Sequence, residues 1–137
     1  MGIDINCLDC SFDGKQCFCY RRQLLDALRV YLKANQSRHE MEFKYINWFY
    51  RDDKEDIERV TDITNEEIAT AFELLRKNKL HGLFCWIFLT EESYISYTEA
   101  QQFLDTYSII KDFMKGPCMD VSILMHAAYH KHNLQCW

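Results

Sequence analysis

The sequence predicts an α+β fold, and three kinds of pattern support this prediction. One N-terminal segment alternates apolar and polar residues, one internal run is apolar throughout, and several segments repeat apolar residues at helical spacing. We therefore expect an N-terminal strand or hairpin and one buried central strand, packed with four to five helices in a single domain over residues 1–137. With 48% hydrophobic residues, four glycines and one proline, the chain can bury one core and shows no signature of disorder.

Two segments carry the strand patterns. Ile3, Ile5 and Cys7 alternate with polar residues in the opening GIDINC, which is typical of a half-buried strand. The run LFCWIFL at 83–89 has the length and composition of a strand that is buried on both faces. Between the early cysteines, the Asp13–Gly14 step predicts a two-residue hairpin turn.

Helical spacing of apolar residues predicts the helices. We expect them over residues 20–34, 41–49, 65–78, 97–115 and from about 120 onward. Ser37 and Ser96 each stand three residues before a glutamate, which is the pattern of a capping box, and Thr64 is a suitable N-cap. Residues 40–50 also alternate with a period of two, so a strand stays open there beside the favoured helix.

The net charge of −5 resides in one acidic segment. Residues 51–67 hold eight acidic residues against three basic ones, while the rest of the chain is balanced. This distribution offers no basic surface for a nucleic acid. The longest apolar run is far shorter than the roughly 20 residues of a spanning helix, and no export signal opens the chain. We expect a cytoplasmic protein with reduced thiols and no membrane partner.

Four of the seven cysteines lie close together near the N-terminus. They are spaced C-x2-C-x6-C-x-C, as Cys7, Cys10, Cys17 and Cys19. Four thiolates can hold zinc, although the second pair and the short insert differ from the usual zinc-ribbon spacing. The alternative interpretation is a hairpin with packed free thiols. A redox dithiol at CLDC is less favoured, because that motif precedes a turn rather than opening a helix.

A second group of metal-ligand side chains lies near the C-terminus. His126 and His130 are one helical turn apart, and His132 and Cys136 follow closely. Two histidines at this spacing can chelate zinc, but no glutamate accompanies them as in H-E-x-x-H. The alternative is a solvated pair, because the predicted buried face of this helix lies opposite to them. That face consists of Val121, Leu124, Met125 and Ala128.

Aromatic residues adjoin the acidic segment and suggest a protein-binding surface. The residues of this predicted surface are Trp48, Tyr50, Asp52, Asp53, Glu55 and Asp56. Aromatic and acidic side chains together favour a basic protein partner, whereas the alternative is that the aromatic rings lie in the core. The leading prediction is a non-catalytic acidic binding module that neutralises a basic protein. A zinc-stabilised accessory protein is the second prediction, and a thiol-dependent enzyme is the third.

Two short regions carry a resemblance to other proteins. The opening MGIDI and the turn TEESYISYTEAQQFL, which leads into a helix, resemble small bacterial and phage proteins that begin M-G-x-D-I and carry an acidic turn before a helix. This sequence has threonine and glutamate where that pattern has a serine–aspartate pair. The resemblance implies a fold type and no activity.

Overall fold

The computed structural model describes residues 2–17, 20–49, 62–87, 93–115 and 119–136. It confirms the α+β class, with helices and a small antiparallel sheet. The elements in chain order are β1 (Gly2–Cys7), β2 (Asp13–Cys17), α1 (Tyr20–Ala34), α2 (Glu40–Phe49), α3 (Asn65–Lys77), α4 (Phe84–Ile87), β3 (Tyr94–Ile95), α5 (Tyr97–Ile110), the 3-10 helix η1 (Lys111–Phe113), α6 (Ser122–His130) and β4 (Leu134–Cys136).

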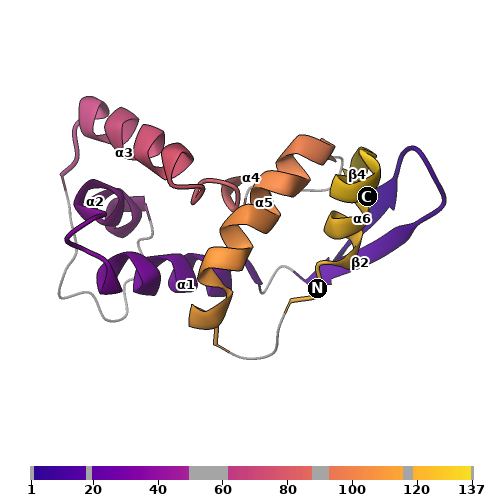
Figure 1. Cartoon of the computed structure of the whole chain (residues 1–137), viewed down its shortest axis with the longest axis horizontal. Helices are drawn as coiled ribbons and strands as arrows, with labels where there is room; N and C mark the ends of the chain where they lie inside the picture. Colours follow the sequence, from indigo (N-terminus) through magenta and orange to yellow (C-terminus); the bar gives the residue numbers. More distant parts are fainter. Residues whose placement is uncertain (1, 18–19, 50–61, 88–92, 116–118, 137) are drawn as a thin grey trace.

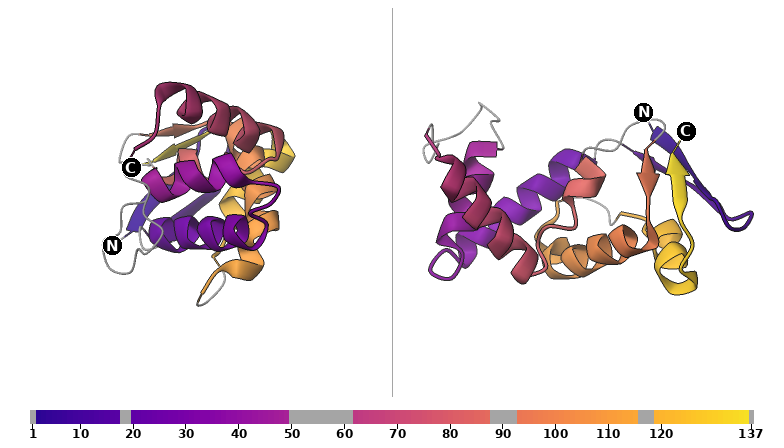
Figure 2. Two further views of the ribbon diagram at one scale, coloured as in Figure 1. Left: turned by 90° about the vertical axis from the view of Figure 1, so that its left-hand side faces the viewer. Right: turned by 90° about the horizontal axis from the view of Figure 1, so that it is seen from above.

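The sheet joins the two ends of the described chain. Its strand order is β2-β1-β4-β3, so β1 pairs with the last strand as well as with its hairpin partner. In Figures 1 and 2 the sheet and α6 lie at one end of the molecule, α1, α2 and α3 gather at the other end, and α5 runs between them. Segments more than 120 positions apart in sequence therefore meet beside α6.

The predicted Asp13–Gly14 turn is wrong. Both residues belong to β2, where Asp13 pairs with Asn6 and Gly14 with Ile5. The connection is instead the loop of residues 8–12, which the Cys7 N–H closes by donating to the Phe12 carbonyl at 3.0 Å. The C-terminal segment also contacts this loop, because the Leu8 N–H donates to the Asn133 carbonyl at 2.9 Å. A local turn motif could not reveal that contact.

The helix starts follow the capping signals at two of three sites. Thr64 and Ser96 cap α3 and α5, each with a complete capping box. Residues 40–49 form the helix α2, which removes the strand alternative for them. That helix begins at Glu40, however, so the predicted capping box of Ser37 and Glu40 does not open it.

The predicted central strand is wrong for the part that the structure describes. Residues 84–87 form the short helix α4, and residues 88 and 89 lie outside the described residues. A short apolar run does not by itself distinguish a buried strand from a buried helical turn. The turn before α4 packs tightly on α5: the Gly82 N–H donates to Thr106 Oγ1, and a Cβ at Gly82 would lie only 1.9 Å from the Gln102 carbonyl oxygen. This close approach favours a compact turn over an extended strand.

Aromatic side chains of α2, α3 and α4 pack together in the core. Tyr45 contacts the rings of Phe49, Phe72 and Phe84 at centroid distances of 5.7–6.3 Å. Trp48 is half-buried and packs against the same core. Among the described residues, no helix is both long and apolar enough to cross a membrane.

Candidate metal centre

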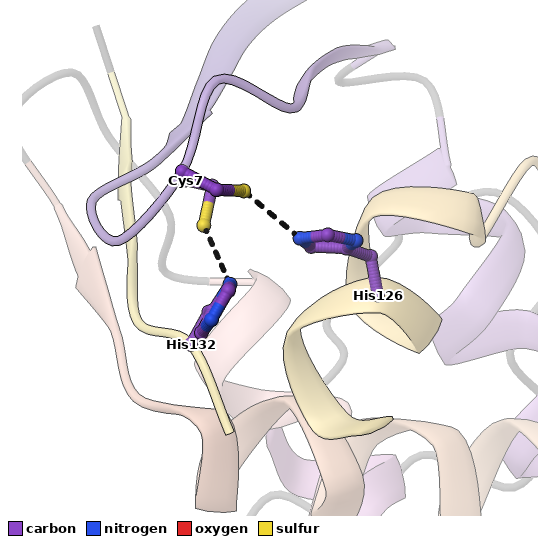
Figure 3. Close-up of side chains that lie close together, drawn as sticks. Cys7, His126 and His132 are labelled. Carbon is purple, nitrogen blue, oxygen red and sulfur yellow. Dashed lines mark hydrogen bonds between the residues drawn. The ribbon is translucent and has the colours of Figure 1, made fainter. Parts of the chain in front are cut away.

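Two cysteines and two histidines come together where the hairpin loop meets α6. One ligand atom from each of Cys7, Cys10, His126 and His132 can be chosen so that all four atoms lie within 4.8 Å of one another. Figure 3 shows Cys7, His126 and His132 pointing toward a common centre from the end of β1, from α6 and from the segment after α6. This four-residue group is called the Cys2His2 cluster below.

The distances within the Cys2His2 cluster are close to those of a tetrahedral zinc site. Cys7 Sγ lies 3.3 Å from His132 Nδ1, and Cys10 Sγ lies 3.1 Å from His126 Nε2. Zinc bonds of about 2.3 Å to sulfur and about 2.0–2.1 Å to nitrogen place neighbouring ligand atoms roughly 3.4–3.8 Å apart. No pair in the cluster exceeds 4.8 Å, so side-chain movements of about 1 Å bring all four atoms to coordination distance.

The cysteines are positioned by the end of β1 and the loop that follows. Cys7 is the last residue of β1. Its N–H donates a hydrogen bond to the Phe12 carbonyl, which folds the loop back on itself. The Phe12 N–H in turn donates to Cys10 Sγ at 3.4 Å. This hydrogen bond orients the Cys10 side chain within the loop, as groups around metal ligands commonly do.

The histidines are brought together by the turn that ends α6. Lys131 has the left-handed conformation, with φ 57° and ψ 45°. Its N–H and the N–H of His132 both donate to the Ala127 carbonyl, which folds the chain back over the last helical turn. His132 therefore lies beside His126, with ring centroids 5.3 Å apart.

Strand pairing and two hydrogen bonds hold the two halves of the cluster together. Leu8 donates its N–H to the Asn133 carbonyl, and the Asn133 N–H donates to Asp9 Oδ2 at 2.9 Å. Cys7 also pairs with Leu134 across β1 and β4. Because these contacts use no cluster side chain, the backbone and the Asp9 carboxylate set the approach of the cysteines to the histidines.

The ring of Phe12 orients one histidine. It stacks on the His126 imidazole with centroids 4.4 Å apart and an interplanar angle of 8°. Stacking fixes the plane of the imidazole, while the Nε2 atom still points toward Cys10. Groups that orient the ligands in this way support metal binding in proteins.

Burial keeps two of the four ligands uncharged when no metal is bound. Burial, together with the hydrogen bond to Cys10, raises the pKa of the Cys7 thiol above its ordinary value of 9.0. Burial and the nearby charges of His130 and His132 lower the pKa of His126 below 6.5. At neutral pH His126 is therefore already in the neutral form that a metal needs, whereas Cys7 must give up a proton.

The cluster combines halves of the two sites that the sequence predicted. Cys7 and Cys10 come from the cysteine group, and His126 comes from the histidine pair. Cys17 is placed elsewhere, because its backbone pairs with Gly2 at the far end of the hairpin, about five residues or 17 Å along β1 from Cys7. Its predicted partner Cys19 lies outside the described residues.

His132, rather than His130, is the second histidine of the Cys2His2 cluster. His130 is exposed and outside the cluster, although its ring lies 4.7 Å from that of His126. The spacing C-x2-C together with H-x5-H could have indicated this ligand set, because both are near zinc-finger spacings. The predicted buried face of α6 is wrong at Met125, which is 57% exposed, while His126 is half-buried against the loop.

The other described cysteines are separate from the cluster. Cys85 donates its thiol to the Gly82 carbonyl, and burial, with a contribution from the charge of Glu99, raises its pKa to about 12. Cys136 is buried in β4, which raises its pKa to about 11. Within the described part of the chain, the Cys2His2 cluster is the only group of three or more metal-ligand side chains in coordination range.

Of the predicted protein-binding surface, Trp48 lies among the described residues. Trp48 packs against the core, as the alternative interpretation expected for the aromatic rings. The other residues named for this surface, Tyr50, Asp52, Asp53, Glu55 and Asp56, lie outside the described residues. A basic protein partner therefore stays a prediction.

No family model, curated protein or solved structure matches the chain. The type of site follows from its donor atoms. Two sulfurs and two imidazole nitrogens form a donor set typical of structural zinc, whereas calcium and magnesium prefer oxygen ligands and iron–sulfur clusters prefer four cysteines. The four donor atoms are the number that a tetrahedral structural zinc site requires.

Proposed function

We propose that the protein is a zinc-stabilised, non-catalytic accessory protein in which one Zn²⁺ joins the N-terminal hairpin loop to α6. The observation that carries this proposal is the Cys2His2 cluster, whose four ligand atoms lie within 4.8 Å although they come from opposite ends of the chain. The two contacting pairs are 125 and 116 positions apart in sequence.

The chemistry of the ligands favours zinc over other metals. Thiolate and imidazole are borderline-soft donors, and a tetrahedral S2N2 arrangement is diagnostic of zinc. The ligand spacings, C-x2-C and H-x5-H, differ from those of a zinc finger mainly in the long insert between the two pairs. In this protein the sheet, rather than a short linker, brings the pairs together.

The zinc has a structural task in a part of the fold that is weakly held otherwise. Two of the four strands are only two and three residues long, so pairing alone stabilises this end of the molecule little. A metal bound at a free concentration 1,000 times its Kd adds about 4 kcal/mol to the free energy of unfolding. For a chain of this length, that corresponds to a Tm increase of about 10–20 °C.

The proposal is tested by measuring zinc content and thermal stability in matched variants. The protein is reconstituted with Zn²⁺, desalted and analysed for metal, and its Tm is recorded with and without a strong chelator. Cys10→Ser and His132→Ala each remove one ligand. Cys17→Ser and His130→Ala are the controls, because each removes the same residue type from the same region without removing a ligand.

We expect one zinc per chain in the wild type and in both controls, with a Tm that the chelator lowers. The two ligand variants should bind zinc weakly and have a Tm that the chelator does not change. A wild-type protein that retains no zinc, with a Tm unaffected by the chelator, would overturn the proposal. Zinc loss in Cys17→Ser would instead support the cluster of four N-terminal cysteines.

A further inference from the structure

We infer that Cys7 and Cys10 form a reversible redox pair through which a peroxide releases the zinc, an inference that rests on the proposed function. The cluster has only two sulfur ligands, and they belong to one C-x2-C segment. A single disulfide between them therefore removes both thiolates from the metal at once. The zinc site would then both stabilise the fold and release its metal on oxidation. We call this second property the redox switch.

The geometry allows the disulfide to form. The two sulfur atoms belong to a group whose members are no more than 4.8 Å apart, and a disulfide needs a separation of about 2.05 Å. Cys10 lies in the loop of residues 8–12, outside the strands, so it can move toward Cys7 without breaking the sheet. Cys10 is also exposed, which gives a dissolved peroxide access to its sulfur.

The other described thiols are poor competitors for the oxidant. Cys85 and Cys136 are held in the interior, and burial raises their pKa values to about 12 and about 11. Since the thiolate is the reactive form, both react slowly with a peroxide at neutral pH. Among the four thiols that the structure describes, oxidation is thereby directed to those of the Cys2His2 cluster.

The reaction balances with hydrogen peroxide as the oxidant. The Cys10 thiolate attacks one peroxide oxygen, the O–O bond breaks, and a sulfenic acid and hydroxide form. The Cys7 thiolate then attacks the sulfenic sulfur and displaces a second hydroxide, so that the S–S bond forms. Two thiolates lose two electrons in total, the peroxide is reduced, and Zn²⁺ is left with two imidazole ligands.

The contacts that remain explain why the change is reversible. The hydrogen bonds of Leu8 and Asp9 to Asn133, and the pairing of β1 with β4, involve no sulfur atom. The loop therefore stays beside α6 after zinc leaves. Reduction of the disulfide regenerates two thiols in place, and zinc can bind again.

The test begins with zinc-loaded protein in the presence of a chromogenic zinc indicator. Hydrogen peroxide is added in small steps, released zinc is read from the indicator, and the protein is then treated with dithiothreitol and fresh Zn²⁺. Peptide mass spectrometry locates the oxidised cysteines. A disulfide lowers the mass by about 2 Da relative to the dithiol.

Two variants make the test specific. Cys10→His keeps a zinc ligand at that position but removes the disulfide partner, so its zinc should resist peroxide. Cys85→Ser is the matched control and should release zinc as the wild type does. If Cys10→His does not hold zinc, the wild-type protein provides the test. A Cys7–Cys10 disulfide that dithiothreitol reverses would then support the redox switch.

We expect release of most of the bound zinc, a Cys7–Cys10 disulfide, and full rebinding after reduction. The inference is overturned by zinc that stays bound after peroxide treatment, or by release that accompanies sulfinic acid formation and cannot be reversed. The protein is loaded with zinc before peroxide is added. Zinc uptake therefore tests the proposed function, and zinc release tests the redox switch. A protein that never takes up zinc contradicts the proposed function, whereas a loaded protein that resists peroxide contradicts only the redox switch.

Discussion

Cys10 Sγ lies 3.1 Å from His126 Nε2, although the two residues are 116 positions apart in the chain. The contact links the hairpin loop near the N-terminus to the last helix. It depends on the pairing of β1 with β4 and on the stacking of Phe12 against His126. A metal bound here would therefore connect the two ends of the described chain rather than neighbouring residues.

Zinc affinity should rise with pH. The pKa of Cys7 is raised mainly by burial, so in protein without metal its thiol is protonated between about pH 6.5 and pH 8.5, and binding must release that proton. The lowered pKa of His126 means that this imidazole is mostly neutral in the same range and contributes less to the pH dependence. Affinity should increase about tenfold per pH unit for the Cys7 proton alone.

This dependence is measured by competition against a chelator of known affinity, corrected for protonation of the chelator itself. A zinc affinity that does not change with pH would contradict the assignment of Cys7 as a thiolate ligand. His130→Ala serves as the control, because it should show the same slope as the wild type.

Replacing Lys131 by glycine should stabilise the turn that positions His132. Lys131 has φ 57°, a conformation that costs a side-chain-bearing residue about 1 kcal/mol and glycine almost nothing. We expect Lys131→Gly to raise the free energy of urea unfolding by roughly 0.5–1 kcal/mol, with zinc content unchanged.

Lys77→Gly is the matched control for this substitution. Lys77 is exposed in the last turn of α3, where glycine should cost about 1 kcal/mol. The two lysine-to-glycine changes are thus expected to have opposite signs. Equal destabilisation by both would show that the turn after α6 does not carry the strain assigned to it.

Removing the Glu42 carboxylate should destabilise the helical end of the molecule. Glu42 is 1% exposed, and its Oε2 atom lies 2.5 Å from His39 Nδ1 and accepts a hydrogen bond from Asn78 Nδ2 at 3.2 Å. Glu42→Ala leaves both partners without this acceptor and should cost roughly 3–5 kcal/mol in urea unfolding. The exposed Glu66→Ala should cost less than about 1 kcal/mol.

Zinc content distinguishes this effect from one at the metal centre. Glu42 lies on α2, at the other end of the molecule from the sheet (Figure 1). We expect Glu42→Ala to bind zinc normally when it is folded. If Glu42→Ala had the same free energy of unfolding as Glu66→Ala, the contacts of Glu42 with His39 and Asn78 would not stabilise the fold.

Local patterns were sufficient for most helices and for the first strand. The spacing of Leu24, Leu28 and Leu32 predicted α1, and the polar caps at Thr64 and Ser96 predicted the starts of two others. These features depend on neighbours within one or two turns of the chain. The strand predicted at 83–89 is wrong for residues 84–87, because the turn before them depends on how closely Gly82 approaches α5, a contact that no local pattern contains.

The metal-ligand residues were only partly predictable for the same reason. Cys7, Cys10 and His126 stood out as metal-ligand types, but no local pattern shows that the two ends of the chain lie side by side. His132 reaches the Cys2His2 cluster through the left-handed turn at Lys131 and the pairing of β1 with β4. The strand pairing is tertiary structure, and lysine is not the residue that usually signals a left-handed turn at a helix end.

The most direct measurement is X-ray absorption spectroscopy at the zinc edge on the reconstituted wild-type protein. The Cys2His2 cluster predicts two sulfur neighbours at about 2.3 Å and two nitrogen neighbours at about 2.0–2.1 Å. The spectrum should be unchanged in Cys17→Ser and altered in His132→Ala. A shell of four sulfur atoms would restore the N-terminal cysteines as the site, and a shell without sulfur would contradict a metal centre built on Cys7 and Cys10.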